Sequence, residues 1–158
     1  MAGRALGTTT GIAYAGWLVL GILTAVLGHE IAHAVAGRML GFRVHRIVAT
    51  LWGGHTSYDG AGSTPGRAAG IAVGGPRANL GLAGIGWIGL RALTGPVAQF
   101  VLWWFVAINL LLAAFNLLPG LPLDGGQVVH SLVWQVSGRR DPALLVAGWL
   151  GRLLTVAV

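Results

Sequence analysis

The sequence contains no cysteine, no lysine and only four acidic residues among 158. Without cysteine, disulfide bonds and thiolate metal sites are excluded, and a transition metal would have to be bound by histidine and carboxylate side chains. The four acids are Glu30, Asp59, Asp124 and Asp141. Any reaction that needs a carboxylate must therefore use one of them.

Charged residues of either sign are scarce. They make up 9% of the chain and apolar residues make up 55%, whereas a soluble domain usually carries about 25% charged residues. This composition excludes an ordinary soluble globule and predicts a protein that lies in the lipid bilayer. The net charge of +6 comes from ten arginines that interrupt apolar runs. A nucleic-acid-binding protein would gather its basic residues on one face among aromatic residues, so we expect no nucleic-acid partner.

Four apolar runs predict helices. The first, residues 11–37, would extend about 40 Å as a helix, which exceeds the roughly 30 Å of a hydrocarbon core. The second contains Pro76 and should kink near it, and the third ends at Pro119. The last run is short for a membrane span. These later runs are residues 68–93, 97–118 and 143–158.

A short β-hairpin is expected between the first two runs. Residues 44–52 are rich in β-branched side chains and are followed by Gly53 and Gly54, a pattern typical of a strand that ends in a turn. The expected fold class is therefore an all-α polytopic membrane protein. It would be a bundle of three to four transmembrane helices with a small β-hairpin or sheet after the first helix.

The distribution of arginines predicts the orientation in the membrane. Residues 38–67 and 119–142 contain six arginines, whereas the loops on the opposite side have only Arg4 and Arg91. Because positively charged loops stay in the cytoplasm, the two arginine-rich loops should face the cytoplasm and the N-terminus should lie outside. We expect a multi-pass protein of the cell membrane whose first helix has its polar end on the cytoplasmic side.

That polar end carries the sequence His29-Glu30-Ile31-Ala32-His33. Four residues turn a helix through about 400°, so the two imidazoles project from one face and can bind one metal ion. Glu30 lies about 100° further round, where its carboxylate can accept a proton from a metal-bound water without being a ligand. The alternative is that these side chains are satisfied by partners in a helix bundle. Ionisable residues inside a membrane segment favour the functional interpretation.

A third ligand must come from elsewhere in the chain, and the sequence has no second glutamate. Asp59 lies in a polar loop, and Asp141 precedes a proline among arginines, as in a surface turn or helix cap. Asp124 follows an apolar run and comes after Pro119 has broken the helix, so its backbone is free to approach another part of the chain, which makes it the best candidate of the three. The alternative for Asp124 is to cap the helix that starts near Gly126.

Two motifs resemble the paired signature of site-2 proteases, the intramembrane zinc metalloproteases of peptidase family M50. The first is His29-Glu30-x-x-His33, and the second is Asn116-x-x-Pro119 followed by Asp124-Gly125. Gly53-Gly54 and Gly75-Pro76-x-x-Asn79 also resemble landmarks of that family. The resemblance covers about residues 28–126 in the expected order and spacing.

The resemblance implies one zinc ion per chain bound by His29, His33 and Asp124, with Glu30 as general base and acid. It also implies that Asn116 lies near the reacting carbonyl, where it either stabilises the oxyanion or donates a hydrogen bond between helices. The strand region after the first motif would line the substrate path, so residues 52–55 are expected to offer Gly53, Gly54 and His55 to an extended peptide.

The implied activity is zinc-dependent endoproteolysis within transmembrane segments of membrane proteins, so the expected partners are a substrate helix and the bilayer. The alternative function is a zinc-binding membrane protein, either a carrier or a sensor, that hydrolyses nothing. An aspartyl protease that uses Asp59 and Asp124 is disfavoured because Asp59 is not in a span. A serine mechanism is disfavoured because every serine lies outside the apolar runs.

The domain organisation is expected to be simple. Residues 1–158 should form a single intramembrane protease core. Members of the family usually have a further transmembrane helix before the one that carries the first motif, and the last apolar run is short. The chain is therefore either a minimal core or a fragment that lacks an N-terminal helix and ends within a C-terminal helix.

Overall fold

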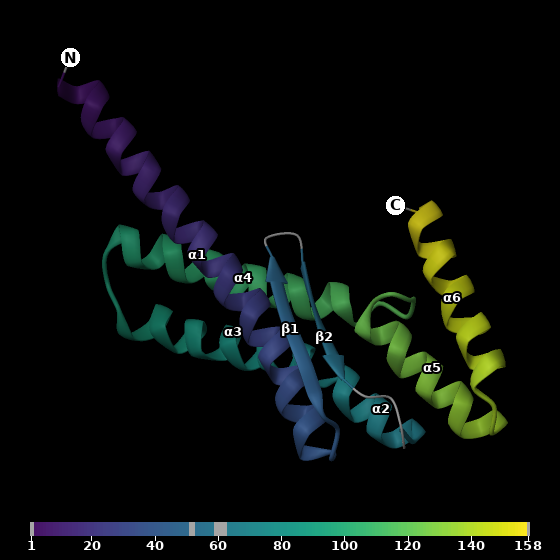
Figure 1. Cartoon of the computed structure of the whole chain (residues 1–158). Coiled ribbons are helices and arrows are strands. Elements are labelled where there is room, and N and C mark those ends of the chain that lie inside the picture. The colour runs from purple at the N-terminus through teal and green to yellow at the C-terminus, as the bar shows by residue number, and fades with distance from the viewer. Residues whose placement is uncertain (1, 51–52, 59–62, 158) are drawn as a thin grey trace.

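The computed structural model describes residues 2–50, 53–58 and 63–157. Within these residues the chain forms six helices and one two-stranded antiparallel sheet (Figure 1). The mainly helical fold with a small hairpin after the first helix agrees with the sequence-based prediction. The elements are α1 (Ala2–Met39), β1 (Val44–Thr50), β2 (Gly53–Tyr58), α2 (Pro65–Ala72), α3 (Gly74–Ala92), α4 (Pro96–Asn116), α5 (Asp124–Ser137) and α6 (Arg140–Ala157).

The long helix α1 ends where glycine permits the chain to reverse. Gly41 has a φ of +86°, a left-handed conformation that costs a glycine little because it has no Cβ. The backbone N–H groups of Gly41 and Phe42 then donate to the carbonyl groups of Arg38 and Gly37. This C-cap sends the chain back along α1 into β1.

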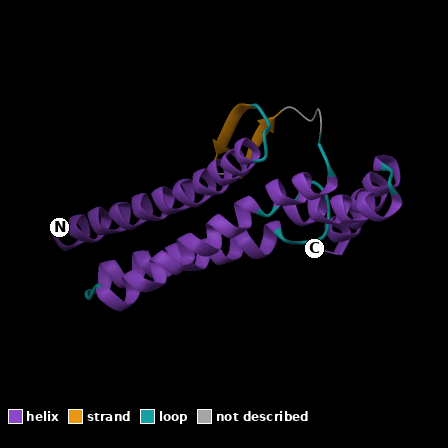
Figure 2. Ribbon diagram, turned by 90° about the horizontal axis from the view of Figure 1, so that it is seen from below, coloured by secondary structure: helices purple, strands orange, loops and turns teal. Residues whose placement is uncertain are grey.

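The hairpin lies along the C-terminal half of α1, on the side away from the other helices (Figures 1 and 2). Its register pairs Val48 with His55 and Ile47 with Thr56. Because β2 follows the turn, His55 and Thr56 come back beside the part of α1 that carries Glu30. The hairpin therefore brings polar side chains to the motif on α1.

The second apolar run differs from the prediction of one kinked helix. The structure divides it into α2 and α3, with the break at Val73, three residues before Pro76. Pro76 has no N–H to donate to the carbonyl of Ala72, so the hydrogen-bond ladder is interrupted one turn before the proline. In the first turn of α3 the missing N–H costs nothing, because that position has no helical partner.

Helices α3 and α4 form an antiparallel pair (Figures 1 and 2). Small residues on α3 allow the close approach, since a Cβ at Gly86 would lie 2.9 Å from Val106 and one at Gly89 would lie 3.2 Å from Leu102. Of the described helices, two are long and apolar enough to cross a membrane. They are Gly11–Met39 within α1 and Pro96–Asn116, which is α4.

Helices α5 and α6 form a second antiparallel pair, and α5 also packs against α2. The loop before α5 is held by α6, because the Leu121 N–H donates to the Ala147 carbonyl at 3.1 Å. Gly151 lies directly against this loop, and a Cβ there would fall far inside contact distance of the Leu121 carbonyl. The position of the loop that precedes Asp124 therefore depends on α6.

Arg140, the first residue of α6, connects this helix pair to the rest of the chain. Its guanidinium donates to the Ser63 carbonyl at 3.1 Å and stacks 4.2 Å above the Trp134 ring. His130 lies on the same side of α5. Burial, together with the nearby charge of Arg140, lowers the pKa of His130 below its ordinary value.

Candidate metal centre

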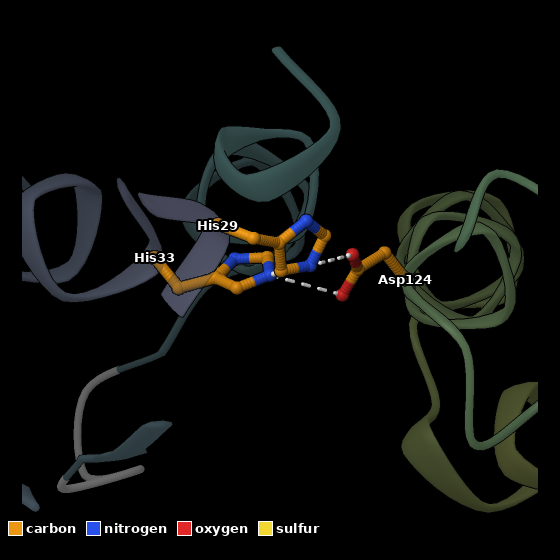
Figure 3. A group of neighbouring side chains, drawn as sticks. All are labelled: His29, His33 and Asp124. Carbon is orange, nitrogen blue, oxygen red and sulfur yellow. Dashed lines mark hydrogen bonds and ion pairs between the residues drawn. The ribbon is translucent and has the colours of Figure 1, made fainter. Parts of the chain in front are cut away.

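The two histidines of the α1 motif lie on one side of the helix, as their spacing predicts. Their Nε2 atoms are 3.0 Å apart, and both residues are buried. Asp124, the first residue of α5, approaches from the opposite side (Figure 3), with Oδ2 3.0 Å from His29 Nε2 and Oδ1 3.3 Å from His33 Nε2. One potential ligand atom from each of the three residues lies within 4.8 Å of the other two.

The outer ring nitrogens of both histidines face acceptors. His33 Nδ1 lies 2.8 Å from the Ile71 carbonyl oxygen, which can only accept, so this nitrogen carries the proton. His29 Nδ1 lies 2.5 Å from Asn79 Oδ1. With the protons on Nδ1, both Nε2 atoms present lone pairs to the same point. Two lone pairs beside a carboxylate attract a cation.

Asp124 has the charge that a ligand needs. Burial raises the pKa of its carboxyl, but hydrogen bonds and positive charge from His29 and His33, when these rings also carry a proton on Nε2, lower it further, so the pKa lies below its ordinary value. Its Oδ2 is buried and makes no hydrogen bond of good geometry despite the approach to His29. Leu123 occupies the N-cap position of α5 without a side-chain cap. Asp124 therefore turns to the histidines and does not cap the helix.

Space for an ion exists because α3 passes the site at a glycine. A Cβ at Gly75 would lie 2.5 Å from His33 Nε2 and closer still to His29 Nε2. Any side chain at position 75 would therefore occupy the region that the two lone pairs face. The donor set, the buried Oδ2 without a partner and this free space together fit a metal ion that histidine and carboxylate ligands bind.

Glu30 lies beside this group and has different neighbours. It is 4% exposed, and the Thr56 hydroxyl is 2.8 Å from its Oε2 and 3.0 Å from its backbone carbonyl oxygen. Glu30, His33 and Asp124 line one cleft of about 210 Å³, together with His55 and Thr56 of β2. A substrate in this cleft would therefore meet the metal ligands, the glutamate and the strand at once.

The other predicted site residues lie further out. Asn116 is half-buried at the end of α4, and its amide donates to the Leu112 carbonyl at 3.0 Å. Gly53 and Gly54 pair with Thr50 and Ala49 in the hairpin. Asn116 is not among the described residues that line the cleft.

The remaining acids lie away from the site or cannot be placed. Asp141 lies in the first turn of α6. Asp59 falls outside the described residues. The same is true of Trp52, which lies at the edge of the expected substrate path.

Four contacts at the site were not predicted from the sequence. They involve Thr56, the Ile71 carbonyl, Gly75 and Asn79. In the sequence, Gly75 and Asn79 stand out only as part of a motif that resembles landmarks of the family. A signal for Asn79 was present, because an amide in an apolar helix must find hydrogen-bond partners. No comparable signal exists for a threonine in a strand or for a backbone carbonyl.

Comparison with known proteins points to one family. Residues 91–151 match the model of peptidase family M50. The protein named zinc metalloprotease Rip3 of Mycobacterium tuberculosis is 38% identical over 87% of this chain and 36% of its own length. The protein named zinc metalloprotease sll0528 of Synechocystis is 36% identical over 85% of this chain and 37% of its own length. The chain thus spans just over a third of these curated relatives.

The fold also matches a solved structure. The site-2 protease from Methanocaldococcus jannaschii superposes with a TM-score of 0.73 at 20% sequence identity, over 87% of this chain and 63% of that protein. At this identity the match concerns the fold. The sequence matches, with which this shared fold agrees, support the site-2 protease family, peptidase family M50, for this chain.

Proposed function

We propose that residues 1–158 form the core of a zinc-dependent intramembrane endopeptidase. One observation carries the proposal: His29, His33 and Asp124 converge beside the buried Glu30. The helix that carries the two histidines and this glutamate is long and apolar enough to span a bilayer. In this proposal the three residues bind one zinc ion per chain, and Glu30 is the general base and acid. The names of the relatives as zinc metalloproteases support the choice of metal.

The residues of the cleft divide the chemistry among them. A bound zinc ion would polarise the scissile carbonyl and lower the pKa of a coordinated water towards about 7. Glu30 takes a proton from the attacking water and returns it to the leaving amine. The Thr56 hydroxyl holds the Glu30 carboxylate by donating to Oε2, so the base keeps one orientation. Asn116 donates one amide N–H to Leu112 and lies outside the described lining of the cleft, so its proposed role as donor to the oxyanion requires the substrate carbonyl to lie beyond that lining.

The substrate would enter as an extended strand. A transmembrane helix hides its carbonyl groups in internal hydrogen bonds, so it must unwind locally before cleavage. Among the described residues the sheet has two strands, which leaves one edge of β2 without a strand partner. His55 and Thr56 of β2 line the cleft, so a peptide added at this edge would reach Glu30. Gly53, Gly54 and His55 are the proposed substrate-binding residues.

The proposed setting is a multi-pass protein of the cell membrane with three to four spans. Besides α1 and α4, large apolar side chains on other helices are exposed, such as Trp87, Ile88 and Trp149 at more than half of their surface. An apolar surface of this extent is stable against lipid and not against water. The excess of arginine in residues 38–67 and 119–142 supports an orientation in which the site faces the cytoplasm.

The alternative is a zinc carrier or sensor, which the buried ligands on a membrane helix would also suit. It gives no role to Glu30, which lies beside the ligands but is held by a hydroxyl. Glu30→Gln separates the two functions, with Asp141→Asn on α6 as the matched control. The chain purified in detergent should bind one zinc ion in wild type and in both variants. A model transmembrane peptide should be cleaved by wild type and by Asp141→Asn alone.

Two results would contradict the proposal. Continued cleavage by Glu30→Gln would remove the glutamate from the mechanism. Bound zinc without cleavage in wild type would favour the carrier or sensor.

A further inference from the structure

Two asparagines lie completely buried in the apolar helices next to the candidate metal centre. Asn79 on α3 and Asn109 on α4 are both 0% exposed. Burying an amide without hydrogen bonds costs several kcal/mol in an apolar environment, so such residues persist where every polar atom has a partner. Neither residue faces the cleft, and neither has a place in the proposed chemistry.

Their hydrogen bonds form a chain that runs in one direction. Asn109 Nδ2 donates to the Phe105 carbonyl at 2.8 Å, which leaves Asn109 Oδ1 as the acceptor for Asn79 Nδ2 at 2.9 Å. The same Asn79 Nδ2 donates to the Ala25 carbonyl on α1 at 3.1 Å. Asn79 Oδ1 is therefore the atom that faces His29 Nδ1, at 2.5 Å.

This arrangement cannot be reversed without penalty. A flipped Asn79 would place its oxygen against the Ala25 carbonyl and against Asn109 Oδ1, which are both acceptors. It would also place its NH₂ group against His29. Because Asn109 is fixed by the Phe105 carbonyl, the orientation of Asn79 is fixed too. His29 Nδ1 must then carry the proton, and its Nε2 must present the lone pair.

We propose that Asn79, held by Asn109, is a positioning residue for the metal centre. It sets the tautomer and the ring orientation of His29, so that the Nε2 lone pair faces Asp124 before any metal arrives. This inference rests on the proposed function, since the metal is the one bound by His29, His33 and Asp124. The Ile71 carbonyl does the same for His33. The pair of asparagines also joins three helices, α1, α3 and α4, at the level of the site.

The test is the zinc affinity of the full chain in detergent, measured by competition with a chromophoric chelator. Asn79→Leu keeps the branching and the number of side-chain heavy atoms, but it is bulkier and has no acceptor for His29. Loss of such a partner typically costs about 10- to 100-fold in metal affinity. Asn79→Asp keeps the acceptor for His29, so the zinc affinity of the folded protein should stay within a few-fold of wild type. Its second oxygen would face the Ala25 carbonyl and Asn109 Oδ1 and should lower the melting temperature. Ser131→Ala is the control, because this buried hydroxyl bonds only within its own helix.

A purely structural role would give a different pattern. It would lower the melting temperature of Asn79→Leu and leave the zinc affinity of the folded protein unchanged, and that result would overturn the inference. The visible spectrum of the cobalt-substituted protein gives a second reading. Altered ligand-field bands are expected in Asn79→Leu and unaltered bands in Ser131→Ala.

A measurement on the wild-type chain covers the case in which the variants do not fold. Nuclear magnetic resonance of protein labelled with ¹⁵N-histidine reports which ring nitrogen of His29 is protonated. A proton on Nδ1 supports the inference and a proton on Nε2 overturns it. If the wild-type chain binds no zinc, the proposed function fails, and the tautomer of His29 still decides whether Asn79 sets it.

Discussion

Replacing Gly75 by alanine should remove metal binding while leaving all three ligands in place. The added Cβ would lie 2.5 Å from His33 Nε2, about 0.9 Å short of the 3.4 Å at which ordinary contact begins. Metal–ligand distances tolerate shifts of only about 0.2 Å, so imidazoles displaced by this amount cannot both bind. We expect zinc affinity to fall by at least about 100-fold, or about 2.8 kcal/mol. Overpacking should cost the fold about 1–3 kcal/mol.

The assay compares Gly75→Ala with two other glycine replacements on α3. A Cβ at Gly74 would lie 3.2 Å from the Ala32 carbonyl oxygen and 3.3 Å from Ala36 Cβ, and no imidazole atom is among its three nearest neighbours. At Gly81 nothing lies within 4 Å, so alanine there should gain up to about 1 kcal/mol of helix propensity. Zinc affinity and thermal unfolding with and without zinc are measured for each.

Only the first variant should lose the metal. Gly74→Ala is expected to melt at a lower temperature and to bind zinc as wild type does, while Gly81→Ala should match or exceed wild-type stability. Zinc should raise the melting temperature of both by mass action, and it should leave that of Gly75→Ala unchanged. If Gly75→Ala binds zinc as tightly as Gly74→Ala, the region beside the two Nε2 atoms is not where the ion lies.

Three further predictions concern the neighbours of the site. Thr56→Val removes the hydroxyl that holds Glu30, so kcat for a model peptide should fall about 10-fold. This is less than the roughly 10²- to 10⁴-fold contribution of a general base, because Glu30 is still present. Thr56→Ser should restore the rate, and zinc affinity should be unaffected in both; an unchanged kcat in Thr56→Val would show that the hydroxyl is irrelevant. The pKa of His130 is lowered, so the folded chain binds fewer protons at this residue than the unfolded chain does. The contribution of His130 to the free energy of unfolding is therefore fully present above pH 6.5 and is lost as the pH falls through the lowered pKa. The melting temperature should therefore drop less between pH 7.5 and 5.5 in His130→Gln than in wild type, and equal drops would contradict the shift. Gly151→Ala forces α6 away from the loop before α5 and should cost about 1–3 kcal/mol, whereas Gly148→Ala meets nothing within 4 Å and should not destabilise. Thermal unfolding compares the two, and equal melting temperatures would show that α6 does not hold the loop.

Local periodicity accounts for the parts of the site that the sequence predicts best. His29 and His33 share a face because helix geometry fixes the relation between residues four apart, and no tertiary information is needed. Asp124 was selected by chemistry, since the chain has few acids, and by the resemblance to a family. That it lies within 3.3 Å of both histidines depends on how α5 docks, which no local pattern encodes.

Contacts between elements account for what was missed. Thr56 reaches Glu30 because of the strand register and the way the hairpin lies on α1, and a shift of one residue would turn it away. The sequence predicts a kink near Pro76, and the structure has the break at Val73. The two differ because the proline can be seen in the sequence, whereas the carbonyl that loses its hydrogen-bond partner lies one turn earlier. The importance of Gly75 lies in the imidazoles it faces across a helix interface, which no local pattern of glycines reveals.

The two carboxylates of the cleft receive different roles from their neighbours. Asp124 faces two imidazole nitrogens whose protons are held on the far side of each ring by the Ile71 carbonyl and by Asn79. When both rings are neutral it thus meets lone pairs, and a cation between them, either a proton or a metal ion, removes the repulsion. Glu30 faces the Thr56 hydroxyl, a donor that satisfies a carboxylate without a metal. An ion that enters the cleft is therefore drawn to Asp124, and Glu30 stays free to accept a proton. Enzymes with two carboxylates in one site commonly separate their functions by environment in this way, and here the hydrogen-bond donors and acceptors around them suffice to do so.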